Sequence, residues 1–185
     1  MHGLIIAILR RTVRSLVPAL LLLPLKGMAE PEPAPVPEYE LKAAFVYNFA
    51  LFTEWPSDTA YEGGTLNICV NPGSALRHAL AALNEKAVKG RRVSVRHLAA
   101  LDTLRACHVL FVDGNDRERW VQIKKGLGGA SVLTVSDDDE IGHDGSIIAL
   151  GVDNKRVVFD VDTRAARQAR LVLSSKLLRL ARTVQ

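Results

Sequence analysis

His108-Val109-Leu110-Phe111-Val112 is an apolar run without the polar alternation of a half-exposed strand, so it predicts a strand buried on both faces. Ser131 to Val135 predicts another, and Leu66 to Val70 a further strand. Helices are expected between these strands, one from Ala75 with Ser74 as its cap and one capped by Asp116. Strands that alternate with helices at this pitch indicate a single layered α/β domain with a largely parallel sheet.

The C-terminal part of the sequence departs from this alternation. Ile147 to Leu150 and Arg156 to Val161 flank Asp153-Asn154, which predicts an antiparallel hairpin and hence a mixed sheet. Thr163 to Arg182 has two interpretations. One is a continuous helix, with Leu171 and Leu178 left on its outer side as a dimer or partner seam. The other, which we prefer, extends the chain at residues 171–173 and starts a new helix with Ser174 as its N-cap.

The first 38 residues are typical of targeting and linker sequence. Residues 1–29 join a basic region to the apolar stretch Leu16 to Leu25 and a small-residue end at Gly27-Met28-Ala29, and they predict a cleaved signal peptide. The apolar stretch is shorter than the about 20 residues that span a bilayer. Residues 30–38 alternate Glu, Pro, Ala and Val and predict an extended leader. The folded domain is expected at 39–185, and the protein in the periplasm.

The charge balance argues against a nucleic-acid partner. The chain has 24 basic and 20 acidic residues, but four of the basic residues lie in the expected signal peptide. The remainder, 24 − 4 = 20, equals the number of acids, and a neutral domain gains little from counterion release. The charge is uneven, however, because the segment from Arg164 to Arg182 holds six basic residues and no acid, whereas acids gather between Asp137 and Asp144.

Two cysteines, Cys69 and Cys107, are present. An even pair in an exported protein predicts one disulfide. The expected positions raise an objection, since neighbouring parallel strands would hold Cys69 near the end of one strand and Cys107 at the start of another beyond bonding distance. A bond would therefore require strands that are antiparallel, offset or not adjacent.

No run of the sequence assembles a catalytic, metal-binding or cofactor-binding set, and we expect no enzyme activity, metal or cofactor. Gly126-Leu127-Gly128-Gly129 precedes a strand and fits a helix end better than a phosphate loop. The acidic run Asp137 to Glu140 lacks calcium-loop spacing and predicts a solvated turn. His97 and His108 are expected to be hydrogen-bonded parts of the structure. In Ser174-Ser175-Lys176 the lysine spacing does not fit a serine acyltransfer motif.

The segment Glu40 to Pro56 predicts a helix whose apolar face holds Leu41, Phe45, Phe49 and Phe52, and which ends before Trp55 because of the following proline. Asn48 falls in the middle of that face, where a buried amide needs partners. It could bond a neighbouring backbone loop. Alternatively, Asn48, Glu54 and Trp55 edge a groove for a ligand or partner.

This segment resembles the opening signature of the YfiR family of periplasmic proteins. Further blocks resemble the family at Cys107 to Val112, Val132 to Asp137 and Ser174 to Ala181, in the same order, over roughly residues 38 to 182. The resemblance supports the Cys69–Cys107 disulfide, because YfiR-like proteins carry cysteines in the corresponding blocks.

The resemblance implies a non-catalytic homodimeric repressor that docks on a membrane-bound, YfiN-type diguanylate cyclase and is sequestered by an outer-membrane lipoprotein. Cyclic-di-GMP would be the output. The sequence has fewer cysteines than the best-known member and an acidic run at residues 137–140, which leaves redox control and the partner open. The alternative is a periplasmic ligand-sensing subunit for a histidine kinase or outer-membrane receptor. A secreted hydrolase is a third class, but it lacks a supporting residue set.

Overall fold

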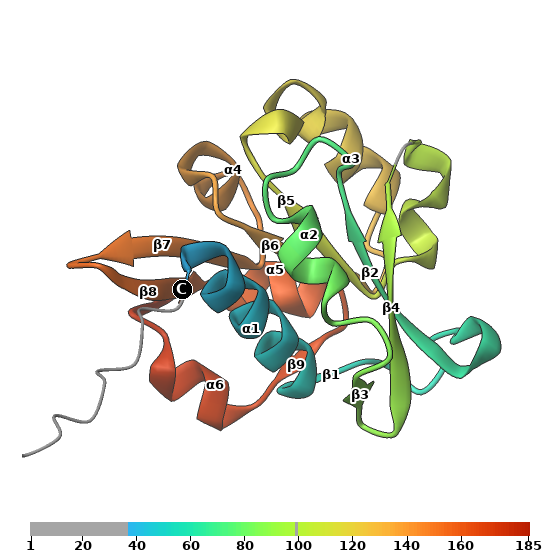
Figure 1. Cartoon of the computed structure of the whole chain (residues 1–185). Coiled ribbons are helices and arrows are strands. Elements are labelled where there is room, and N and C mark those ends of the chain that lie inside the picture. Colours follow the sequence, from blue (N-terminus) through green and yellow to red (C-terminus); the bar gives the residue numbers. More distant parts are fainter. Residues whose placement is uncertain (1–36, 99) are drawn as a thin grey trace, which may run out of the picture. The chain divides into compact units, whose positions relative to one another are not determined.

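An eight-stranded sheet runs through the domain in the computed structural model, which describes residues 37–98 and 100–185 (Figure 1). The strand order is β10-β8-β7-β6-β5-β2-β4-β3, and a separate antiparallel pair joins β1 to β9. The strands are β1 (Thr53–Glu54), β2 (Thr65–Val70), β3 (Ala87–Val88), β4 (Arg91–His97), β5 (Val109–Val112), β6 (Leu133–Ser136), β7 (Ile148–Asp153), β8 (Arg156–Val161), β9 (Val172–Leu173) and β10 (Thr183–Val184).

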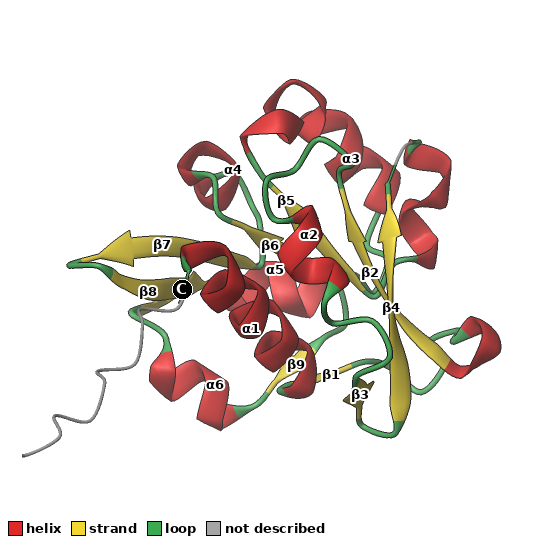
Figure 2. Cartoon of the chain, in the orientation of Figure 1, coloured by secondary structure: helices red, strands yellow, loops and turns green. Residues whose placement is uncertain are grey.

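Helices lie on both faces of this sheet (Figure 2). The α-helices are α1 (Glu38–Leu51), α2 (Arg77–Ala81), α3 (Trp120–Leu127), α4 (Asp139–His143), α5 (Thr163–Gln168) and α6 (Ser175–Leu180), and the 3₁₀ helices are η1 (Glu62–Gly64), η2 (Leu101–Ala106) and η3 (Gly114–Arg119). The central strands β4, β2, β5, β6 and β7 are parallel, β3 is antiparallel to β4, and β8 is antiparallel to β7 but parallel to β10. The predicted mixed, largely parallel α/β fold is therefore confirmed.

Alternate residues of the central strands serve two apolar cores. On β2, Ile68 and Val70 join the core beneath α1 and α2, whereas Cys69 joins the core beneath η2 and α3. Because side chains alternate across a strand, a strand covered on both faces must be apolar throughout. All four residues of β5 are buried, as predicted for residues 109–112.

The C-terminal predictions are confirmed in outline. β7 and β8 form the expected hairpin, but the turn falls one residue later, at Asn154 and Lys155, which both have positive φ. The helical region breaks as preferred, and the Ser174 hydroxyl accepts the Leu177 backbone N–H at 3.2 Å. The alternative of one continuous helix from Thr163 to Arg182 is wrong, because α5 ends at Gln168, α6 ends at Leu180 and residues 183–184 pair with β8 as β10.

Two cap predictions and one turn prediction need correction. α2 begins at Arg77 rather than Ala75, and Leu76, not Ser74, is its N-cap residue. Asp113, not Asp116, is the N-cap of η3, and Asp116 stands three residues on, where its carboxylate accepts the Asp113 backbone N–H at 3.2 Å. The expected solvated turn at residues 137–140 is wrong, because Asp138 caps α4 and Asp139 begins it. The predicted signal peptide at 1–29 lies outside the described residues. Most of the predicted leader at 30–38 lies outside them too; of its two described residues, Pro37 and Glu38, the second begins α1.

Candidate functional site

A groove of about 760 Å³ lies between α1 and α2 and is a candidate binding surface. We call it the α1–α2 groove; it is lined by Pro37, Tyr39, Glu40, Ala43, Ala44, Tyr47 and Asn48 on the α1 side and by Ala75, His78, Ala79, Ala82, Leu83 and Lys86 on the α2 side. Five alanines allow a partner's backbone to approach closely, and Tyr39 is 49% exposed. The groove can therefore accept an apolar segment of another molecule.

Asn48 lies in this groove, but the reason differs from the prediction. The buried side of α1 is formed by Ala43, Val46, Phe49 and Ala50, whereas Asn48 is exposed. The helix is thus rotated by roughly 100°, one residue step, from the orientation expected from its aromatic residues. Phe45 reaches the core sideways, with its ring centroid 6.0 Å from that of Phe159. The prediction of a buried Asn48 amide is therefore wrong.

Glu54 and Trp55 line a different hollow from Asn48. This Trp55 hollow measures about 300 Å³ and is formed by Glu54, Trp55, Tyr61, Leu66, Val88, Lys89 and Arg91. The segment around β3 lies between the two hollows and is hydrogen-bonded to α1 and to the residues that follow α1. The Tyr47 hydroxyl donates to the Ala87 carbonyl at 2.7 Å, and Lys89 Nζ donates to the Thr53 carbonyl at 2.7 Å. The alternative of one groove edged by Asn48, Glu54 and Trp55 thus becomes two neighbouring hollows, and binding of a ligand or partner at either one stays a prediction.

The Trp55 hollow contains unsatisfied hydrogen-bonding groups. The indole Nε1 of Trp55 is buried without a partner among the described residues. Arg91 stacks its guanidinium 3.6 Å from the centroid of the Tyr61 ring, and it makes no ion pair within the part of the chain described. A donor and an unpaired cation beside two aromatic rings can hold a small anionic or polar group.

His108 lies beside Tyr61, one of the residues that line the Trp55 hollow. Its ring stacks on Tyr61 with centroids 4.5 Å apart and planes inclined by 7°. Nδ1 accepts the Asn67 backbone N–H at 2.9 Å, so Nε2 carries the hydrogen and donates to the Ala60 carbonyl at 3.0 Å. Burial lowers the pKa of His108, and the nearby Arg91 and Arg96 lower it further, against the raising effect of the Ala60 bond. The His108 side chain is a hydrogen-bonded part of the structure, as its sequence position predicted.

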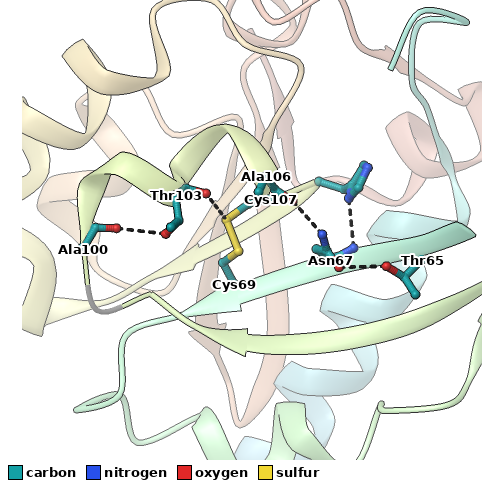
Figure 3. Close-up of a disulfide and its surroundings, with 8 residues drawn as sticks. Thr65, Asn67, Cys69, Ala100, Thr103, Ala106 and Cys107 are labelled. Atoms are coloured by element: carbon teal, nitrogen blue, oxygen red, sulfur yellow. Dashed lines mark hydrogen bonds between the residues drawn. A yellow bond between two sulfur atoms is a disulfide. The ribbon is translucent and has the colours of Figure 1, made fainter. Parts of the chain in front are cut away.

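A disulfide joins Cys69 to Cys107 with the two Cα atoms 5.7 Å apart (Figure 3). Cys69 lies in β2, while Cys107 follows η2 and precedes β5. The strands are adjacent and parallel, as the objection supposed. The bond forms because Cys107 lies outside β5, directly after the 3₁₀ helix η2. η2 packs against the same apolar core that contains Cys69. The predicted bond is present, and the objection failed because it treated residue 107 as part of the strand.

Acidic residues between Asp137 and Asp144, after β6, form ion pairs with basic residues of the same fold. Lys42 Nζ lies 3.0 Å from Asp137 and 2.8 Å from Glu38, with only 9% of the lysine side chain exposed. Burial raises the pKa of Asp137, opposed by its bond to Lys42. Asp138 pairs with Arg117, and Asp144 pairs with Lys124 at 2.7 Å. Within residues 37–98 and 100–185, no group of three or more His, Cys, Asp or Glu side chains is placed to hold a metal ion.

The carboxyl edge of the parallel strands, where open α/β sheets commonly bind ligands, is tied together by its own loops. Asn71, after β2, donates to Asp116 at 2.9 Å. Asn115, after β5, donates to the Gly73 carbonyl at 3.4 Å. The fold and these contacts define an α/β domain in which these hydrogen-bonding groups at the carboxyl edge are committed to structure, whereas the α1–α2 groove and the Trp55 hollow are open.

A family model described as YfiR/HmsC-like matches residues 39–182, and the chain belongs to this family. The family is periplasmic, regulatory and non-catalytic. Within the described residues, no helix has the length and apolar character needed to cross a bilayer. A search of curated proteins gives no match.

Two solved structures share the fold. A conserved domain protein from Vibrio cholerae O1 biovar El Tor strain N16961 matches with a TM-score of 0.52 and 11% identity, over 80% of this chain and 60% of that one. An ABC domain in complex with L-Trp from Streptococcus pneumoniae matches with a TM-score of 0.51 and 5% identity, over 76% and 62%. The chain thus spans about three fifths of each of these longer chains, and the likeness concerns the fold alone.

Proposed function

We propose that this protein is a periplasmic regulator that docks on a membrane-bound signalling enzyme, a YfiN-like diguanylate cyclase, and represses it. The family match over residues 39–182 carries the proposal, because it spans nearly the whole described domain. The α1–α2 groove supports it by offering an open, alanine-lined surface. Cyclic-di-GMP is the output of such a cyclase, and an outer-membrane lipoprotein that sequesters the regulator would release it.

Repression requires only unequal binding. A regulator that binds the inactive state of the cyclase more tightly than the active state shifts the equilibrium by the difference in binding free energy. No covalent step by the regulator is needed. We also propose that the working unit is a homodimer, since a two-fold regulator matches a two-fold enzyme. Sedimentation of the purified protein as a monomer at working concentration would contradict this part alone.

Ala82→Arg tests the docking surface. Ala82 is exposed on the wall of the α1–α2 groove, so a long charged side chain fills the groove without disturbing the core. We expect cells carrying this variant to raise cyclic-di-GMP to the level of a strain that lacks the gene. Ala81→Arg is the matched control, because Ala81 is also exposed on this helical segment but does not line the groove. If deletion of the gene leaves cyclic-di-GMP unchanged, the proposed function fails. If deletion raises it and the two variants behave alike, only the assignment to this groove fails.

A second function is favoured by the Trp55 hollow. The unpartnered Trp55 Nε1 and the unpaired Arg91 fit a ligand-sensing subunit for a histidine kinase or outer-membrane receptor. Trp55→Phe removes the indole N–H and keeps an aromatic ring. A set of amino acids and small carboxylates, screened by thermal shift, should include one that stabilises the wild type and not this variant. Stabilisation of both proteins by the same compounds would argue against the hollow.

A further inference from the structure

Small side chains line both walls of the α1–α2 groove at helical spacing. Ala43 and Ala44 lie on α1, whereas Ala75, Ala79 and Ala82 lie on α2 and the turns beside it. Residues three or four apart share one side of a helix, so each wall is a low ridge that lets another backbone approach closely. Two such ridges leave a trough of the kind into which the side-chain ridge of a third helix packs.

A helix matches this trough better than an extended segment does. Extended peptides bind by adding a strand to the open edge of a sheet. Most of the described lining belongs instead to α1 and to the helical turns of α2, whose backbone groups bond within the helix and are not available to a strand. Along α1 the lining runs from Tyr39 to Asn48, nine residue steps or about 14 Å, so a helix of about ten residues spans it.

Opposite charges mark the two ends of the groove. Glu40 is exposed near the start of α1 and makes no ion pair among the described residues. Lys86 is also exposed, pairs with no acid in the described chain, and lies with Nζ 5.5 Å from the centroid of the Tyr47 ring. Tyr47 is seven residues beyond Glu40, so Lys86 lies about two turns further along α1 than Glu40 does. An occupant that lies along α1 therefore meets an acid at one end and a cation at the other.

We propose that the α1–α2 groove binds an amphipathic helix of the partner enzyme, antiparallel to α1. Acidic residues are favoured in the first turn of a helix and basic residues in the last turn. In the antiparallel direction the first turn of the bound helix meets Lys86 and its last turn meets Glu40. In the parallel direction each end would bring like charges together. The inference rests on the proposed function only in that a membrane enzyme docks in this groove, and it does not require that enzyme to be a cyclase.

Photo-cross-linking in living cells tests both the helix and its direction. Tyr39→p-benzoylphenylalanine and Asn48→p-benzoylphenylalanine each place a photoreactive side chain at one end of the groove, at positions that are exposed. Val121→p-benzoylphenylalanine is the control, since Val121 is 69% exposed on α3 and does not line the groove. After irradiation, mass spectrometry of the adducts identifies the cross-linked peptides.

We expect both groove positions to react with one helix of the same membrane protein, and the control position not to react with it. The Asn48 adduct should lie about two turns nearer to the N-terminus of that helix than the Tyr39 adduct. Adducts in the opposite order, on an extended segment, on a second copy of this chain, or at neither groove position would overturn the inference. If the helix belongs to a membrane protein other than a diguanylate cyclase, the inference stands and the partner named in the proposed function fails.

Charge reversal tests the match at the two ends. Glu40→Lys and Lys86→Glu should each weaken docking about fivefold, measured as the yield of the Asn48 adduct at low expression, because an attraction at the rim becomes a repulsion. Glu118→Lys is the matched control, since Glu118 is exposed on η3 and does not line the groove. This control should change the yield by less than about twofold, because only long-range attraction is altered. Circular dichroism must show that all three variants remain folded. No loss in either groove variant, or an equal loss in the control, would reject the antiparallel direction.

Discussion

Removal of the Cys69–Cys107 disulfide should cost this domain a large part of its stability. The bond closes a loop with a sequence separation of 38 residues. In the chain-entropy model this loop corresponds to about 4 kcal/mol at 25 °C, because the cross-link removes conformations from the unfolded chain. For a domain of this size we expect the melting temperature to fall by about 10 °C.

Chemical denaturation of wild type and Cys69→Ala/Cys107→Ala, followed by circular dichroism, measures the change. Both cysteines are 3% exposed, so lost packing adds to the effect, and Cys→Ser should cost more than Cys→Ala because it buries a hydroxyl. Reduced wild type should match the alanine variant to within about 1 kcal/mol. A loss below about 1 kcal/mol in the alanine variant would refute the entropic reasoning and point to an unfolded chain that already holds these segments together.

Two further changes follow from the buried polar groups. Lys42→Met leaves Asp137 without its cation and should lower the free energy of unfolding by about 1 to 3 kcal/mol. The loss is smaller than for a fully buried pair, because the Asp137 side chain is 17% exposed. Thermal denaturation should show that Lys42→Met/Asp137→Leu recovers most of the lost stability, and no recovery would contradict the pairing. The folded pKa of His108 is lowered, so its contribution is complete above the unfolded pKa of about 6.5 and declines as pH falls from there toward the folded pKa. Unfolding free energy measured against pH should thus fall less steeply below about pH 6.5 in His108→Gln than in wild type, and identical slopes would exclude this histidine as the cause.

Local signals predicted the elements that local chemistry specifies. Ser174 was identified as a cap because the bond from its hydroxyl to the Leu177 N–H spans only three residues. The β7–β8 hairpin was similarly predictable, since Asn favours the left-handed conformation that its turn requires. The buried strand β5 followed from its uninterrupted apolar sequence.

Tertiary packing explains what the sequence could not predict. The rotation of α1 that exposes Asn48 depends on which side chains the sheet accepts, and large aromatic residues are not always the most buried. The pairing of Lys42 with Asp137 joins residues 95 positions apart, so no local pattern indicates it. β10 has only two residues and forms because β8 offers a free edge. The division of the predicted groove into two hollows depends in turn on the path of β3.

The pairing of β1 with β9 bears on when the polypeptide can acquire its final form. Thr53 lies opposite Leu173, and the Ser174 N–H bonds the Phe52 carbonyl at 2.9 Å. A ribosome must therefore synthesise more than nine tenths of the chain before the exit of the first helix finds its partner. Contacts so distant in sequence slow folding, because a long loop must close before they form. The contact between β1 and β9 should therefore form late, after strands β2 to β8 of the central sheet have been synthesised.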